Sequence, residues 1–454
     1  MEEKFYLTMF EYFFSSIKKI CKIEDLRFKI GITLGFLLVY RFSSYVPLPG
    51  INPQGVIHFM ENGNTGEKGL LQIIYSFSGV AFSRASVLAL GIMPFISSSI
   101  FVHLISLIFP SLKKDGESGR INRIIRMVTI IACFIQAPTY CDILTTKFIP
   151  FSYAPKAYLL DLSISMEKVF FWVISIVVLT VGTFFTIWIG ENITDKGIGN
   201  GVSLIIMSGI VDRFPNALYT EIVSHLGARG GLFFLFFECL LWLLVVCFCV
   251  TLIQAVRKVP VQYVGRIEQN SIRLMTRHYI PLKVISVGVM PIIFAQSIML
   301  FTMILSANLR ETFKNVYGFW YNLVFSIFII FFTFFYTAVT IPVHQIADDL
   351  KRDGGHIPKV KPGKETLDYL DYILAVVTIP GSFLLVIIAI LPSFIVKIGV
   401  TNNLALFYGG TSLLIIVGSL LDTMQQIDPY FLNDHYDHLL SLYHQKLWIG
   451  IKNT

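Results

Sequence analysis

The residues of this sequence that could do chemistry are few, and their spacing builds neither a catalytic site nor a metal site. The run DHYDH at residues 434–438 contains metal-binding residue types, but the sequence gives it no fixed fold. The six cysteines show no C-x-x-C spacing and fall mostly in apolar runs, so we expect reduced core thiols. No Ser/His/Asp or Cys/His combination can be identified. The sequence therefore predicts no enzymatic activity, no metal and no cofactor.

The run GIGNG at residues 197–201 is the one glycine-rich motif. It lies between two apolar segments instead of following a strand, and no G-x-x-x-x-G-K-[ST] motif accompanies it, so phosphate binding is not supported. We expect a tight turn with close helix packing. Glu238 and Asp422 fall within apolar segments, where charges usually mark ion or proton routes. The sequence identifies no partner for either, and a proton-coupled carrier would normally need more charges.

Composition places these residues in a membrane protein. The 454 residues have a mean hydropathy of +0.69, with 55% hydrophobic and 14% charged residues, as polytopic membrane proteins do. Acids at Glu2 and Glu3 and lysines at Lys18 and Lys19 interrupt the first residues, so we expect no cleavable signal peptide. In a soluble protein, a net charge of +7 would suggest nucleic-acid binding. In this chain the distribution of the Lys and Arg residues between the loops decides how the charge is interpreted.

Ten apolar segments can be marked along the chain as membrane spans, of which the fifth is the weakest because Asp212 and Arg213 end its apolar part early. Of the 36 Lys and Arg residues, 25 lie at the N-terminus, the C-terminus and the loops that follow even-numbered spans, 10 lie in the other loops, and Arg41 lies near the end of the first segment. The positive-inside rule therefore predicts ten spans with both termini in the cytosol. The segments are 30–47, 87–109, 127–144, 169–189, 199–211, 231–256, 284–305, 319–341, 372–396 and 404–425.

The second segment has features of a water-lined path. Its 23 uncharged residues could cross a hydrocarbon core of ~30 Å, but Gly91 and Pro94 interrupt it and three serines follow at 97–99. Residues 70–82 before it are apolar but too short to span. Irregular backbone at membrane depth persists only where protein or water satisfies it. A proline-kinked packing helix with serines at a helix contact is the alternative.

The chain divides into two halves of five spans. We expect a cytosolic N-terminal segment (1–26), an N-terminal half (27–230), a C-terminal half (231–425) and a cytosolic tail (426–454). Two basic loops, 257–283 and 342–370, are long enough to protrude from the membrane. Such loops bind either lipid head groups or an acidic partner such as RNA or another protein. No residue-level repeat between the halves is obvious.

Seven separate stretches of the chain resemble the SecY family, the channel subunits of the Sec protein-export translocon, in its bacterial branch; a plastid homologue is the less favoured source. They are YVPLPGINP (45–53), FSGVAFSRASVLALGIMPFISSSI (77–100), KKDGESGR (113–120), WIGENITDKGIGNGVSLII (188–206), IPLKVISVGVMPIIFAQSI (280–298), ADDLKRDGGHIPKVKPGKET (347–366) and FYGGTSLLIIVGSLLDTM (407–424). The resemblance implies an all-α polytopic membrane protein. Its ten transmembrane helices would form two inverted five-helix halves around an hourglass pore.

The resemblance also implies three groups of site residues in the pore. A plug, about residues 74–86, would include Phe77, Ser78, Gly79, Phe82, Ser83 and Arg84. A hydrophobic pore ring would fall on Ile92, Ile96, Val202, Ile206, Ile293 and Ile415, with Val202 one methylene smaller than the isoleucine of its relatives. A lateral gate would lie between Ser97 and His103 on the second span and Ser297 and Phe301 on the seventh, His103 often being Gln in relatives.

Partners follow from the same resemblance. Arg257, Lys258 and Lys361 would dock the SecA motor and the ribosome, although Lys361 stands where relatives carry Arg and so lacks the planar five-donor fork. The other implied partners are SecE-like and SecG-like small membrane subunits, precursor proteins bearing signal peptides, and the lipid bilayer. Specific DNA binding is not implied. The implied location is the inner (plasma) membrane, with a plastid membrane less favoured.

The implied activity is a protein-conducting channel that passes unfolded secretory proteins and releases hydrophobic segments sideways into lipid. An aliphatic ring offers no ligands to hydrated ions and makes no specific hydrogen bond to a passing peptide. The alternatives are a secondary transporter of a small solute, working through Glu238 or Asp422, and a scaffold without an aqueous path. Residue chemistry alone leaves channel and transporter equal; the resemblance favours the channel.

Overall fold

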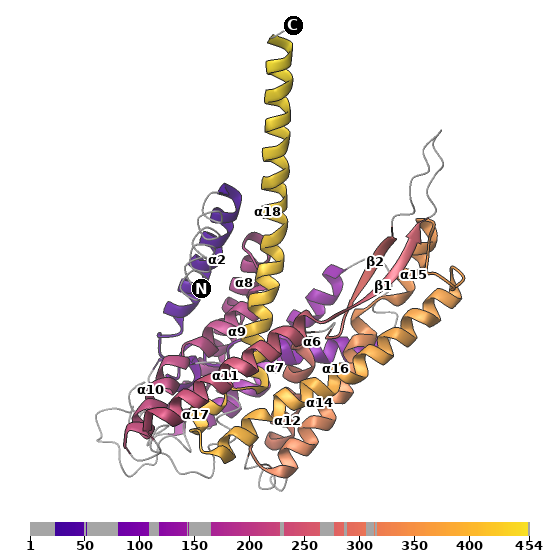
Figure 1. The fold of residues 1–454 in the computed structure, drawn as a ribbon. Helices are drawn as coiled ribbons and strands as arrows, with labels where there is room; N and C mark the ends of the chain where they lie inside the picture. The colour runs from indigo at the N-terminus through magenta and orange to yellow at the C-terminus, as the bar shows by residue number, and fades with distance from the viewer. Residues whose placement is uncertain are drawn as a thin grey trace.

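The computed structural model is mostly helical and describes residues 23–49, 51, 80–108, 118–142, 144, 165–227, 231–263, 277–285, 288–305, 313 and 316–452. Each of the ten predicted apolar segments contains a helix within this part of the chain (Figure 1). The helices of the first half are α2 (Glu24–Ser43), α5 (Val80–Ser83), α6 (Met93–Ile108), α7 (Ser118–Asp142), α8 (Ser165–Lys196), α9 (Gly201–Val211) and α10 (Phe214–Gly227). Those of the second half are α11 (Gly231–Gln254), α12 (Met290–Leu305), α14 (Phe319–Thr340), α15 (Val343–Arg352), α16 (Lys364–Ile398), α17 (Asn402–Ala405) and α18 (Gly410–Lys452).

Five helices of the described chain are long and apolar enough to cross a membrane by length and composition. They lie within residues Arg120–Cys141, Phe170–Lys196, Phe233–Gln254, Phe319–Arg352 and Lys364–Ile398. Two apolar helices are shorter, Met93–Ser106 in α6 and Met290–Met299 in α12. At a rise of about 1.5 Å per residue, a helix of 16 residues such as α6 reaches only about 24 Å. The two short helices are those that the family resemblance assigns to the lateral gate.

The second predicted span is interrupted at Gly91, as expected, but not at Pro94. Residues 84–92 form turns, Gly91 has a φ of 54°, and α6 begins only at Met93. Pro94 is therefore the second residue of the helix, where its missing N–H costs no hydrogen bond, and it does not kink the helix interior. The expectation of a proline-kinked span is wrong here. The break precedes the helix because Gly91 adopts a left-handed conformation that other residues avoid.

The two halves share a repeat that the sequence inspection missed. Gly91 is followed by Ile-Met-Pro, and Gly288, with a φ of 63°, is followed by Val-Met-Pro. In both halves the glycine ends an irregular segment, and the Met-Pro pair opens a 16-residue helix, α6 or α12. The pattern G-[IV]-M-P-x-I places Ile96 and Ile293 at equivalent positions. This residue-level correspondence agrees with two related halves.

The two basic loops fold together instead of protruding separately. Strands β1 (Val256–Tyr263) and β2 (Arg277–Lys283) form an antiparallel pair, and β3 (Gly355–His356) pairs with the far edge of β1, giving the order β2-β1-β3. A small apolar core joins the sheet to α15 and α16. Its buried members are Val259, Val261, Leu282, Leu350, Ile357, Leu370 and Leu374. Outside this small sheet, the secondary-structure elements of the described residues are helices, in line with the predicted all-α class.

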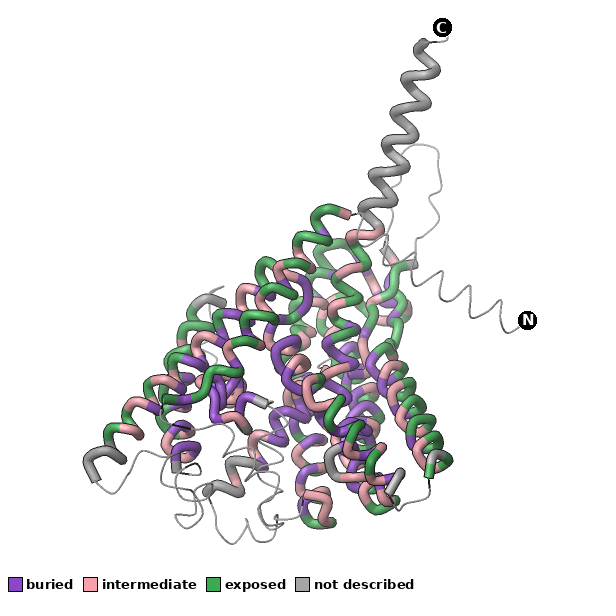
Figure 2. The backbone as a smooth tube through the Cα atoms, turned by 90° about the vertical axis from the view of Figure 1, so that its left-hand side faces the viewer, coloured by how far each residue is buried: buried purple, intermediate pink, exposed green. Residues whose placement is uncertain are grey.

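The sheet and the free end of α18 lie toward the same end of the helix bundle, and α10 and α17 lie at the other end (Figure 1). The two basic loops and the C-terminal helix therefore share one side, as the distribution of Lys and Arg predicts. Buried residues concentrate inside the bundle, and exposed ones follow its outer helix faces (Figure 2). On α11 those outer residues are large and apolar, for example Phe233, Phe236 and Leu244. An apolar outer face suits contact with lipid or another membrane helix.

Candidate functional site

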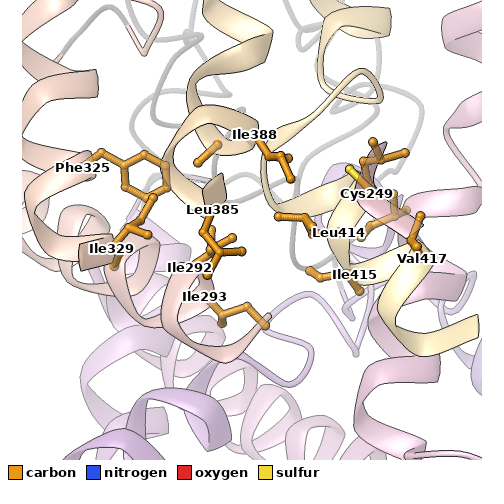
Figure 3. Packing of buried hydrophobic residues seen from close by; sticks show 14 of the residues in the cluster. Cys249, Ile292, Ile293, Phe325, Ile329, Leu385, Ile388, Leu414, Ile415 and Val417 are labelled. Carbon is orange, nitrogen blue, oxygen red and sulfur yellow. The ribbon is translucent and has the colours of Figure 1, made fainter. Parts of the chain in front are cut away.

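The six predicted ring residues come from four elements and lie in one cluster of apolar side chains. Ile92 precedes α6, Ile96 lies on α6, Val202 and Ile206 on α9, Ile293 on α12, and Ile415 on α18. Five of them are buried; Val202 is partly buried and packs against the cluster. Figure 3 shows the part of the cluster that contains Ile293 and Ile415. The cluster joins the halves, because α6 contacts α12 and α9 contacts α18.

The glycine run at 197–201 positions the two ring residues of α9. Asn200 caps this helix, its side-chain oxygen accepting hydrogen bonds from the N–H groups of Val202 and Ser203. A Cβ on Gly201 would lie 1.9 Å from the Gly190 carbonyl oxygen of α8, so only glycine fits there. Gly199 has a φ of 89°. The prediction of a tight turn with close helix packing is confirmed.

The described part of the plug segment is anchored to the N-terminal half. Phe82 on α5 is buried, its ring centroid lies 4.8 Å from that of Tyr140 on α7, and the Tyr140 hydroxyl donates a 3.0 Å hydrogen bond to the Phe82 carbonyl. The chain after α5 then pairs with the chain after α2: the Leu48 N–H donates to the Ala85 carbonyl at 2.8 Å. Ser83 ends α5. Phe77, Ser78 and Gly79 lie outside the described residues.

Arg84 connects the same segment to the end of α2. Its guanidinium lies 4.0 Å from the centroid of the Tyr45 ring, a cation–π contact. Arg41, at the end of α2, lies 5.5 Å from that ring and forms an ion pair with Asp212 at the end of α9. The chain between α2 and α6 is therefore held at two adjacent points.

The lateral-gate residues are placed only in part. Ser97 is partly buried; its hydroxyl donates to the Pro94 carbonyl at 3.0 Å and accepts a 3.5 Å hydrogen bond from Gln136 on α7 of the same half. His103 is partly buried on α6. Ser297 donates to the Ile293 carbonyl on its own helix at 2.8 Å. Phe301 lies on α12, but its side chain is outside the described set. In this state the Ser97 hydroxyl bridges α6 to α7.

The three predicted docking residues face solvent. They lie on the unit that the two basic loops, 257–283 and 342–370, form together through the small sheet, called the loop unit below. Arg257 and Lys258 are exposed near the start of β1, opposite Leu282 and Pro281 of β2. The Lys361 side chain is 85% exposed and lies 3.7 Å from Glu365, an ion pair of little energetic weight at such exposure. Pairing of β1 with β3 brings the two loops into one unit. That pairing could not be predicted from the sequence, because β3 is only two residues long.

Glu238 is the clearest residue whose surroundings sequence reasoning missed. No partner was expected, yet its carboxylate lies beside His225, which also contacts Glu221 one helical turn away. The i,i+4 spacing of Glu221 and His225 was a signal that could have been read. Of the five described cysteines, Cys133, Cys141 and Cys249 are buried, as expected of core thiols, whereas Cys239 and Cys247 are exposed on α11.

Comparison with known proteins identifies relatives along almost the whole chain. A model of the SecY family matches residues 86–424. The chain is 34% identical over 447 residues to protein translocase subunit SecY of Chlamydia muridarum, covering 94% of this chain and 98% of the relative. It is 34% identical over 455 residues to the same subunit of Mycobacterium tuberculosis strain H37Rv, covering 95% and 100%. With the subunit of Aquifex aeolicus it shares 34% over 436 residues, covering 92% and 98%.

Solved structures share the fold at lower identity. A protein-conducting channel superposes with a TM-score of 0.61 at 15% identity, covering 89% of this chain and 92% of that one. Sec61 in a canine ribosome–channel complex from the endoplasmic reticulum superposes with a TM-score of 0.56 at 14% identity, with the same coverage. At this identity the likeness concerns the fold alone.

Proposed function

This chain belongs to the SecY family, and we propose that it is the channel-forming subunit of a bacterial protein translocase. It is a multi-pass membrane protein that passes unfolded secretory proteins across the membrane and releases hydrophobic segments sideways into lipid. The observation that supports the pore assignment is that Ile92, Ile96, Val202, Ile206, Ile293 and Ile415, drawn from both halves, all belong to or pack against the largest apolar cluster of the described bundle, which has 35 buried members. Membership of this family does not favour the alternative of a solute transporter.

The chemistry of the ring suits a channel for polypeptides. Aliphatic side chains offer no ligand to a hydrated ion, and a narrow apolar constriction can lose its water, so the closed ring resists leak. The same side chains make no directional hydrogen bond to a passing chain, so sequence matters little during passage. The same aliphatic residue types therefore suit both states of the channel: they seal it against ions when it is closed, and they do not select among polypeptides when it is open.

Sideways release would occur between α6 and α12, which contact each other across the halves. Both helices are short, and a glycine with positive φ lies two residues before the Met-Pro pair that opens each of them, so each is preceded by a turn that can absorb movement. A passing segment would enter lipid when transfer is favourable, at roughly −0.5 kcal/mol per leucine against about +3 kcal/mol per charge. The gate thereby sorts segments by hydrophobicity.

The loop unit is the proposed docking surface for a SecA-type motor and the ribosome. It is exposed, it carries Arg257, Lys258 and Lys361, and its sheet fixes the two loops relative to each other. Small SecE-like and SecG-like subunits would cover part of the apolar outer helix faces. We further propose that both termini lie in the cytosol, as the excess of Lys and Arg on that side predicts.

Crosslinking tests the proposal directly. In a background without the six native cysteines, single cysteines at Ile92 and Ile415 are expected to react with a crosslinker on a precursor stalled during translocation. Cysteines at Met127 and Ile131, which are 60% exposed on the outer face of α7, are the matched controls and should not react. Equal reaction at outer and ring positions, or reaction at outer positions alone, would contradict the pore assignment.

A further inference from the structure

A buried cluster of ionisable side chains lies where α10, α11 and the residue before α17 meet, and it contains none of the six predicted ring residues. Glu221 and His225 lie on α10, and Glu238 lies on α11. Their exposed fractions are 2%, 4% and 5%. Burying two carboxylates costs several kcal/mol per ion unless they are compensated. Among the described residues, His225 is the nearest group that can offset their charge.

The donor atoms of this cluster converge on one point. His225 Nε2 lies 2.9 Å from Glu221 Oε1 and 3.2 Å from Glu238 Oε2. One ligand atom from each residue lies within 4.8 Å of the others. The Oε2 atom of Glu238 is buried and has no hydrogen-bond partner among the described residues. The hydrogen bond between His225 Nε2 and the Glu238 carboxylate involves the other oxygen, Oε1, at 3.3 Å. Oε2 therefore lies beside the histidine without a donor that satisfies it.

The surrounding residues fix the orientation of each donor. Thr401 donates to Glu221 Oε2 from its backbone N–H at 3.1 Å and also from its hydroxyl, so Oε1 is the oxygen that faces His225. The Phe234 ring lies 5.5 Å from the His225 ring, centroid to centroid. The Tyr408 hydroxyl donates to the Glu238 backbone carbonyl at 2.9 Å and holds that turn of α11. Supporting contacts of this kind accompany metal ligands in proteins.

We propose that Glu221, His225 and Glu238 bind a divalent transition-metal ion of the Zn²⁺ class. Zinc takes one imidazole nitrogen and carboxylate oxygens at about 2.0–2.2 Å, which sets neighbouring ligand atoms of a tetrahedron about 3.4 Å apart. The separations of 2.9 Å and 3.2 Å are close to that value. Two negative charges and one neutral nitrogen match the charge of a divalent ion. The i,i+4 pair on one helix face is a common arrangement of zinc ligands.

The ion would link the two halves of the chain. Glu221 and His225 belong to the last helix of the N-terminal half, Glu238 belongs to the first helix of the C-terminal half, and Thr401 precedes α17. Bound metal would therefore stabilise the junction between α10 and α11. This inference does not depend on the proposed function, because metal binding is measured without any transport assay.

Metal binding to the full-length chain tests the proposal. The chain is purified in detergent without a histidine tag, stripped with a chelator, supplied with Zn²⁺ or Co²⁺, and analysed by elemental mass spectrometry and visible absorption. We expect one ion per chain, the strong visible bands of four-coordinate Co²⁺, and a higher melting temperature with metal than without it. Wild-type protein that holds no stoichiometric ion would overturn the proposal.

Variants locate the ion. His225→Gln and Glu238→Gln keep side-chain size or shape and should lose the Co²⁺ bands and the thermal shift. The matched controls are His344→Gln on the exposed face of α15 and the double change His435→Gln and His438→Gln in the tail, all of which should bind as the wild type does. Loss of binding only in the tail variant, or unchanged binding in His225→Gln, would refute the assigned site. The wild-type stoichiometry decides the matter even if a variant fails to fold.

Discussion

Tyr140→Phe is the most informative single substitution for the plug. It removes one hydroxyl, which donates a 3.0 Å hydrogen bond to the Phe82 carbonyl, and leaves both aromatic rings in contact. The hydroxyl joins α7, a helix of the N-terminal half, to the segment that the SecY resemblance assigns to the plug. If that segment seals the resting channel, weakening its anchor should raise the ion leak of the closed state.

The free-energy cost of Tyr140→Phe depends on whether the Phe82 carbonyl keeps another hydrogen-bond donor. The Phe82 carbonyl also accepts the Ala85 N–H at 3.2 Å, so it keeps one hydrogen bond after the substitution. The cost is therefore the net value of one buried hydrogen bond, about 1 kcal/mol, and not the larger cost of an unpaired group. About 1 kcal/mol changes the ratio of displaced to seated segment roughly fivefold, since 1.4 kcal/mol is about tenfold.

The assay compares ion conductance of the resting channel in planar bilayers. We expect about fivefold more open time in Tyr140→Phe than in wild type. Tyr408→Phe is the matched control, because it removes the same kind of bond, a buried tyrosine hydroxyl donating at 2.9 Å to a backbone carbonyl, in the other half. Unchanged leak in Tyr140→Phe, or an equal rise in both variants, would refute the reasoning.

Three further substitutions test packing and docking. Gly201→Ala should lower the melting temperature strongly, because its Cβ would lie 1.9 Å from a carbonyl oxygen of α8. The control Gly35→Ala should not, because a Cβ there would have no atom within 4 Å. Equal melting temperatures of the two variants would contradict the close packing. Thr33→Val should destabilise the chain by about 1–3 kcal/mol, because it removes the hydroxyl that accepts the buried Ile198 N–H at 2.9 Å, and an unchanged thermal melt would count against this. Lys361→Glu should weaken ribosome binding in a salt-dependent way. It should leave the melting temperature unchanged, since the side chain is 85% exposed, and Lys361→Arg should preserve binding. Loss of folding in Lys361→Glu would contradict a purely docking role.

Much of the fold could be predicted because membrane insertion depends on local properties. Hydropathy located a helix in every predicted span, and the alternation of Lys and Arg agrees with the basic loops sharing one side of the bundle. Glycine spacing also predicted the tight turn before α9, because the absence of a Cβ has a direct steric consequence at Gly201. The start of α6 at Met93 was not predicted, since an uncharged run does not reveal where its backbone turns.

The sequence alone determined a polytopic membrane protein and its family, because apolar length, charge distribution and ordered motifs are written along the chain. Only the tertiary structure decided that two basic loops share one sheet, that Tyr140 holds Phe82, and that Glu238 meets His225. These contacts join residues whose own segments carry no signal for each other. Their partners are set by how whole helices pack, and packing depends on the summed burial of many side chains, not on any local pattern.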